Sequence, residues 1–126
     1  MIPKFRAYDS SSYRRMYQPE EVMVGNGDIW IIDEDSCDHE WIINNDLHLM
    51  QSTGLKDKNG QEIFEGDILG TKDGLRNGIV KYNRDLGMWA NSLLRYQNFE
   101  RLCVVHRDRE IIGNVYENPE LLEVTE

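Results

Sequence analysis

The chain has 126 residues and is acidic, with 23 Asp and Glu against 14 Lys and Arg and a formal net charge of −9. A chain of this length suits one domain, or two small lobes that share a core. It has no apolar run of the roughly 18 residues that a membrane-spanning helix needs and no secretory leader, so we expect a cytoplasmic protein without membrane contact.

The N-terminal part is predicted to be a small antiparallel sheet. Apolar residues in Ile2–Tyr8 indicate a first strand, Asp9–Ser12 a turn, and Tyr13–Tyr17 a returning strand. A hairpin follows over residues 22–32, because Gly25-Asn26-Gly27-Asp28 separates two apolar runs.

An acidic segment interrupts this sheet. Seven acidic residues and no Lys or Arg lie between Asp28 and Asp46. The carboxylates could bind a hard cation, and Cys37 with His39 could bind a softer one. A metal site needs ligands that converge from fixed positions, and one Cys-x-His pair does not supply them. We interpret the segment as a solvated loop and expect folding to need no divalent metal.

The stretch from Met50 to Leu69 has the sharpest turn signal of the chain. Asn59-Gly60 is the leading dipeptide of tight hairpin turns, so Gly60 is predicted at a positive φ. Ile63-Phe64 and Ile68-Leu69 are predicted strands on either side of a break at Glu65-Gly66-Asp67.

Carboxylates in this stretch have two possible interpretations. A calcium loop with Gly60 at its sixth position would place Leu55 and Gly66 at ligand positions, so that interpretation fails. Asp57 is better explained by hydrogen bonds to backbone amides in a turn. The acidic residues Glu62, Glu65 and Asp67 could act as acid and base, but no His, Ser or Cys lies near them in sequence. We interpret them as residues of turns and solvated faces.

The C-terminal half is predicted to be a small barrel or sandwich of short strands. Predicted strands cover Gly78–Tyr82, Met88–Ala90, Leu102–Val105 and Ile111–Tyr116. Residues 91–100 suggest an irregular or one-turn helical insert. A short helix is predicted from Pro119 through Leu122, with Asn118 as its N-cap.

Several single residues in these elements have both a functional and a structural interpretation. His106, Arg107 and Arg109 could contact phosphate, but a solvated hairpin tip is the commoner role of such a run. An apolar run favours an inert role for Cys103, and Cys37 and Cys103 follow no disulfide pattern. The tryptophans are interpreted as core residues rather than stacking platforms; they are Trp30, Trp41 and Trp89.

Three stretches resemble the YopX family of small phage and prophage proteins. The run Leu49–Ile68 resembles the central motif of the family, Lys4–Asp9 its opening and Ile112–Leu122 its close. The chain departs from the family pattern at Ser52, where an aromatic residue is expected, and in the acidic insert before residue 47. The resemblance implies an N-terminal β-rich part, a C-terminal barrel similar to SH3-like folds, self-association, and no established biochemical activity.

These observations predict a mostly β protein. An N-terminal β-rich subdomain is expected over residues 1–46, and an SH3-like β-barrel with a short C-terminal helix over residues 47–126. No residue is predicted to be catalytic, to bind a cofactor or to bind a metal, so we expect no enzyme. The predicted role is a phage- or prophage-encoded interaction or assembly module in a bacterial host cell, with homo-oligomers or a phage or host protein as partners.

The alternative is an accessory protein that binds nucleic acid through the C-terminal barrel. Residues 1–50 carry a net charge of −6 and residues 51–126 carry −3. Phosphate binding needs clustered Lys and Arg, so only the C-terminal half keeps this option open. The net negative charge argues against nucleic acid as a partner, and we expect weak or no binding of duplex DNA at physiological salt.

Overall fold

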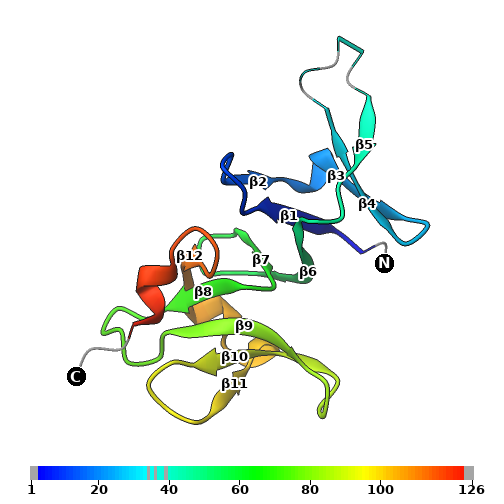
Figure 1. Ribbon diagram of the computed structural model, residues 1–126. Coiled ribbons are helices and arrows are strands. Elements are labelled where there is room, and N and C mark those ends of the chain that lie inside the picture. The colour runs from blue at the N-terminus through cyan, green and yellow to red at the C-terminus, as the bar shows by residue number, and fades with distance from the viewer. Residues whose placement is uncertain (1–2, 34, 36, 39, 124–126) are drawn as a thin grey trace. The chain divides into compact units, whose positions relative to one another are not determined.

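A computed structural model describes residues 3–33, 35, 37–38 and 40–123. The chain forms two compact units, Met1–Gln51 and Ser52–Glu126, here called the N-terminal and C-terminal units (Figure 1). The protein is mostly β, and its helices are single short turns, as the sequence predicts. No helix in the described part of the chain is long and apolar enough to cross a membrane.

Two groups of antiparallel strands make up most of the N-terminal unit. The strands are β1 (Phe5–Asp9), β2 (Arg15–Tyr17), β3 (Val22–Gly25), β4 (Asp28–Ile32) and β5 (Trp41–Ile43). β1 pairs with β2, and a separate sheet has the order β3-β4-β5. The predicted first strand and its return are confirmed, although Ile2 lies outside the described residues.

The hairpin between β3 and β4 is confirmed by its backbone. Asn26 has φ 53° and Gly27 has φ 79°. A two-residue hairpin turn with both central residues at positive φ matches the twist of the flanking strands, and Asn-Gly adopts it at low cost. Local sequence therefore determines this turn.

A small hydrophobic core holds the N-terminal unit together. Ala7 of β1, Ile31 of β4 and Leu47 are buried together. Partly buried apolar residues surround them, namely Tyr17, Val22, Ile29 and Leu49. One side of the β3-β4-β5 sheet therefore packs against β1.

The long strand β6 (His48–Lys56) passes from one unit to the other. Its first residues pair with β1, whereas Ser52 and Lys56 pair with β7 (Glu62–Phe64). The turn between β6 and β7 is closed by the Gly60 amide, which donates to the Asp57 carbonyl at 3.0 Å. Gly60 has φ 81°, which confirms the predicted positive φ.

Replacing Gly60 with valine is expected to lower the free energy of unfolding by about 1 kcal/mol or more, because a β-branched residue resists positive φ. An added Cβ would meet no atom within 4 Å, so the penalty comes from the backbone alone. Gly25→Val is the matched control, because Gly25 has equally open surroundings without a positive φ. Chemical denaturation of both variants is the measurement, and equal losses would contradict this explanation.

A five-stranded antiparallel sheet forms the C-terminal unit. Its strands are β8 (Asp67–Gly70), β9 (Gly78–Asn83), β10 (Met88–Leu93), β11 (Phe99–Arg101) and β12 (Glu110–Asn114), in the order β11-β10-β9-β8-β12. Its core consists of Ile63, Leu69, Val80 and Leu102, against which Leu55, Trp89 and Ile111 pack. Closure into an SH3-like barrel stays a prediction.

The predicted strand over Leu102–Val105 is wrong, because these residues form the helical turn α1 (Leu102–Val105). Only Leu102 enters the core, while Cys103 and Val104 are exposed. A four-residue apolar run has no period that separates a strand from a helical turn. Cys103 is therefore exposed rather than part of a buried strand, and its inert role stays a prediction.

The helical alternative for residues 91–100 is also wrong. Residues 91–93 extend β10, and Phe99–Arg101 forms β11. The Leu93 amide donates to the Asn98 carbonyl at 3.0 Å, which closes the loop between the two strands. The backbone N–H and C=O groups of these residues are therefore hydrogen-bonded between strands of the sheet and not within a helix.

The predicted C-terminal helix is present as a 3₁₀ turn over Pro119–Leu122. Asn118 stands at its N-cap position, but its side chain does not cap the turn. Its Oδ1 instead accepts a hydrogen bond from the Asn114 amide at 3.2 Å. The predicted N-cap position is confirmed, but the asparagine side chain connects the turn to β12 instead of capping it.

Candidate functional site

The principal candidate surface is an apolar face of the β3-β4-β5 sheet. Directly paired residues of antiparallel strands lie on the same face, and alternate residues of one strand share a face. The observed register pairs Met23 with Trp30, Trp30 with Ile43, and Ile32 with Trp41. We call these five residues the ribbon face. Asp28, at the hairpin end of this face, accepts a hydrogen bond from Asn45.

The ribbon face is open to solvent. Met23 is 48% exposed, Trp41 39% and Ile43 48%. The opposite face of the same sheet contains Ile31, which is buried in the core of the unit. The sheet thus has two apolar faces. The face with Ile31 is covered at that residue, whereas Val24 and Ile42 of the same face are 41% and 40% exposed.

The tryptophans differ in their environment. Trp89 packs against the C-terminal core, as predicted. Trp30 is partly buried, and its indole Nε1 donates to the Gly25 carbonyl at 3.3 Å. Trp41 is exposed, so its interpretation as a core residue is wrong. Its strand Trp41-Ile42-Ile43 is apolar at every position, which is the sequence signal that both faces need a cover.

The described residues of the acidic segment form no metal site. Asp33 Oδ1 accepts the Asp35 amide at 3.0 Å, which is a local turn interaction. Cys37 is exposed, and His39 lies outside the described residues, so the Cys37–His39 pair cannot be placed. Within residues 3–33, 35, 37–38 and 40–123, no group of three or more His, Cys, Asp or Glu could hold a metal.

Asp57 has the structural role that turn chemistry predicts. Its carboxyl group is buried and accepts three backbone hydrogen bonds. Oδ1 accepts the amides of Asn59 and Gln61, each at 2.9 Å, and Oδ2 accepts the Ile111 amide at 3.0 Å. The third bond joins the β6–β7 turn to β12, which no local pattern predicts.

The other carboxylates of the central stretch differ in their surroundings. Asp67 is buried, and its Oδ2 accepts the Phe64 amide at 2.7 Å. Glu62 accepts a hydrogen bond from the Ser52 hydroxyl. Glu65 lies in the turn between β7 and β8. The contacts of Asp67 and Glu62 described above are structural.

A buried ion-pair network is the feature that sequence analysis missed. Arg109 Nη2 lies 2.6 Å from Glu100 Oε2, and Arg76 Nη1 lies 2.9 Å from the same oxygen. Asn91 is fully buried and donates from Nδ2 to Glu100 Oε1 at 3.1 Å. The prediction that Arg109 lies in a solvated tip is therefore wrong.

The environment of Glu100 stabilises its charged form. Burial by itself raises the pKa of this carboxyl group, but hydrogen bonds from Arg109, Asn91 and Arg76 outweigh burial and lower the pKa below its ordinary value of 4.5. A perturbed carboxyl group can mark a catalytic site. Here both oxygens are engaged by protein donors, so the network is structural.

The neighbours of Arg109 in the charged run have other roles. His106 Nδ1 lies 2.6 Å from the Lys56 carbonyl oxygen, and Arg107 is exposed. His106–Asp108 forms a 3₁₀ turn after α1 rather than a hairpin tip.

Comparison with known proteins establishes kinship. The chain resembles the solved structure of protein EF1440 from Enterococcus faecalis, with 34% identity, a TM-score of 0.63, and coverage of 98% of this chain and 99% of that one. It also resembles protein yopX from Bacillus subtilis, with 18% identity, a TM-score of 0.59, and coverage of 95% and 98%. No curated protein matches. The model of the family described as YopX protein matches residues 4–123, and the chain therefore belongs to the YopX family.

Proposed function

We propose that this YopX-family protein is a non-catalytic assembly module, encoded by a phage or prophage, that associates with further copies of itself in the cytoplasm of a bacterial host. The ribbon face is the observation that carries the proposal. It brings two tryptophans, two isoleucines and a methionine to one side of a three-stranded sheet. Contiguous apolar patches larger than a few hundred Å² are rare on monomeric proteins, and such patches mark interaction sites.

A second copy of the chain suits this face. Most oligomers of one chain have twofold symmetry, in which the same patch of both copies meets itself. An acidic patch would repel its own copy, whereas the five side chains of the ribbon face carry no charge. β5 is also an edge strand of its sheet, and edge strands present unpaired backbone groups that a second copy can cover.

The acidic residues of the N-terminal unit should make self-association depend on salt concentration. Residues 1–50 carry a net charge of −6, so the rims of two N-terminal units repel each other. Moderate salt screens exposed charges beyond about 8–10 Å. Association is therefore expected to strengthen from low to moderate salt, with an interface above about 1,000 Å² in total.

Ile43→Lys is expected to weaken self-association at least tenfold, because it places a charge in the centre of the apolar contact. Ile42→Lys is the matched control. The two isoleucines are neighbours in β5 with similar exposure, 40% for Ile42 and 48% for Ile43, but they lie on opposite faces. Light scattering of both variants at micromolar concentration measures the mass, and thermal unfolding verifies that each is folded.

Two outcomes would overturn the proposal. One is a monomer mass for the unmodified protein at both low and moderate salt. The other is an oligomer whose mass is unchanged by Ile43→Lys, or is reduced equally by both substitutions.

A further inference from the structure

The acidic chain contains one basic stretch. Residues 78–107 hold five Lys and Arg against only Asp85 and Glu100, a net charge of +3, so the remaining residues carry −12. Glu100 is turned into the ion-pair network with Arg76 and Arg109, which neutralises its charge. The stretch covers β9, β10, β11 and α1 of the C-terminal unit.

The strand register places two cations of the basic stretch on one face of the sheet. Ala90 pairs with Lys81 on one side and with Arg101 on the other, so both cations lie on the same face. Ser92 pairs with Phe99 in the next row of this face. β9 and β11 are separated only by β10, so the backbones of the two cationic residues lie about 10 Å apart. We call these five residues the basic face.

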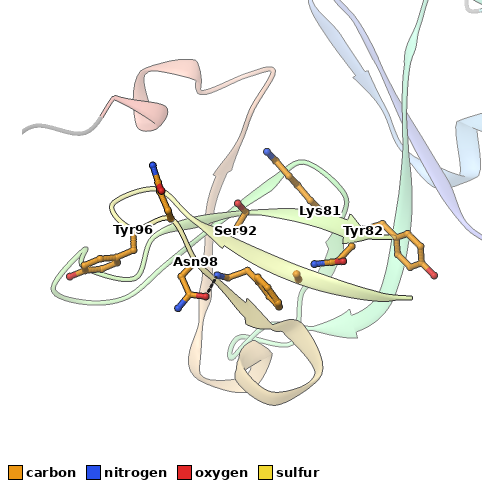
Figure 2. A pocket seen from close by; sticks show the side chains of 9 residues that line it. Lys81, Tyr82, Ser92, Tyr96 and Asn98 are labelled. Carbon is orange, nitrogen blue, oxygen red and sulfur yellow. Dashed lines mark hydrogen bonds between the residues drawn. The ribbon is translucent and has the colours of Figure 1, made fainter. Parts of the chain in front are cut away.

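A shallow groove of about 380 Å³ lies over part of the basic face and is lined by its Lys81, Ala90, Ser92 and Phe99 (Figure 2). Arg101 does not line the groove and is placed beside it by the pairing with Ala90. Ala90 lies in its floor, and Asn98, Gln97 and Tyr96 contribute from the loop before β11. Figure 2 shows Tyr96 and Tyr82 at opposite ends, with Lys81 and Ser92 between them.

The aromatic rings of the groove differ in availability. Tyr82 packs edge-on against Trp89, with ring centroids 5.2 Å apart. Tyr96 and Phe99 are exposed. Lys81 and Arg101 form no ion pair with any residue of the described ranges. The face therefore presents free cations beside free ring surfaces.

We infer that the basic face binds single-stranded nucleic acid. Unpaired bases stack on exposed aromatic rings, and cations track the backbone phosphates, which is a sequence-tolerant mode of binding. Phe99 and Tyr96 supply the rings, Lys81 and Arg101 the phosphate contacts, and Asn98 an amide that can hydrogen-bond base edges. A duplex hides its base faces, so it gains only the cationic contacts and meets the repulsion of a −9 chain. An acidic peptide would use the cations and leave the rings unused.

Fluorescence anisotropy of a labelled oligothymidylate of about 12 nucleotides tests this inference. Lys81→Ala and Arg101→Ala are each expected to weaken binding severalfold and to reduce the slope of log affinity against log salt by about 0.7. Arg107→Ala is the matched control for charge, because Arg107 is an exposed cation of the same basic stretch but lies outside the sheet. It is expected to leave the affinity within about twofold.

Phe99→Leu separates stacking from packing, because leucine keeps an apolar side chain but has no ring. Binding of the oligothymidylate is expected to fall at least fivefold, with unchanged thermal unfolding. Ile43→Lys lies in the other unit and is expected to leave binding unchanged, so this test is independent of self-association.

The inference would be overturned by no binding at low salt, by binding that Phe99→Leu leaves unchanged, or by equal competition from a duplex of the same length. Equal competition by polyglutamate would likewise replace nucleic acid with an acidic protein segment as the occupant.

Discussion

Replacing Arg109 with methionine is expected to lower the free energy of unfolding by about 3–5 kcal/mol, because a buried carboxylate then loses its closest partner. The Arg109 and Glu100 side chains are each only 9% exposed. Arg109 holds both carboxylate oxygens, with Nη2 2.6 Å from Oε2 and Nε 3.3 Å from Oε1. Denaturant titration at neutral pH measures the loss.

Arg76→Met is the matched control for this prediction. Arg76 binds the same Glu100 oxygen at 2.9 Å, but its side chain is 61% exposed. Solvent-exposed ion pairs contribute about 0–1 kcal/mol, so the loss is expected to stay below about 1 kcal/mol. Equal losses for Arg76→Met and Arg109→Met would show that burial does not set the strength of this network. The double variant with Glu100→Met is expected to recover part of the loss, because it also removes the stranded charge.

The pH dependence of stability gives an independent readout of the network. The pKa of Glu100 is lower in the folded protein than the ordinary value of 4.5. The stabilisation is therefore complete above pH 4.5 and is lost as the pH falls through the folded pKa. In Arg109→Met, burial acts against fewer hydrogen bonds, so the folded pKa of Glu100 is expected to rise. The variant should therefore lose less stability than the unmodified protein as the pH falls below 4.5. Unfolding titrations at descending pH compare the two proteins, and superimposable profiles would contradict the assignment.

The second large effect is expected at Asp57, where alanine should cost about 2–4 kcal/mol. One carboxylate accepts the amides of Asn59, Gln61 and Ile111. Its removal leaves these N–H groups without their acceptor, and the Ile111 amide belongs to β12 rather than to the turn. Denaturant titration measures stability, and hydrogen exchange of the Ile111 amide reports whether β12 loosens.

Asp73→Ala is the control for the Asp57 prediction. Asp73 also accepts local hydrogen bonds in a turn, from the Leu75 amide at 3.0 Å and the Thr71 hydroxyl at 2.7 Å. These partners all lie within one exposed loop, so water can replace the carboxylate. A clearly smaller loss is expected. If Asp73→Ala cost as much as Asp57→Ala, or if Ile111 exchange were unchanged in Asp57→Ala, the link between turn and strand would not be what stabilises the unit.

Much of the local backbone could be predicted from neighbouring residues. Asn26-Gly27 and Asn59-Gly60 were predicted as turns, and the structure has Gly27 and Gly60 at positive φ. Such turns depend on the backbone preferences of two residues, which no distant contact needs to supply. The strands beside these turns could also be predicted, because their apolar residues need burial on at least one face of a sheet.

Burial and partners were decided by tertiary structure alone. Arg107 and Arg109 belong to one charged run, yet only Arg109 is buried. The reason is that Glu100 of β11 lies where its carboxylate can pair with Arg109. In the same way Leu102 enters the core while Cys103 and Val104 of the same turn do not. Sequence patterns report the hydrophobicity of a residue, but not which surface of the fold will cover it.

The ribbon face and the basic face were likewise predictable from sequence only in part. The sequence determined that Trp41-Ile42-Ile43 is apolar throughout and that residues 78–107 are basic. Strand register decides which residues of β5 share a face with Trp30. It also places Lys81 and Arg101, 20 residues apart, on either side of Ala90 on one face. A shift of one residue in register turns every side chain to the other face, so only the folded sheet decides which residues form a surface.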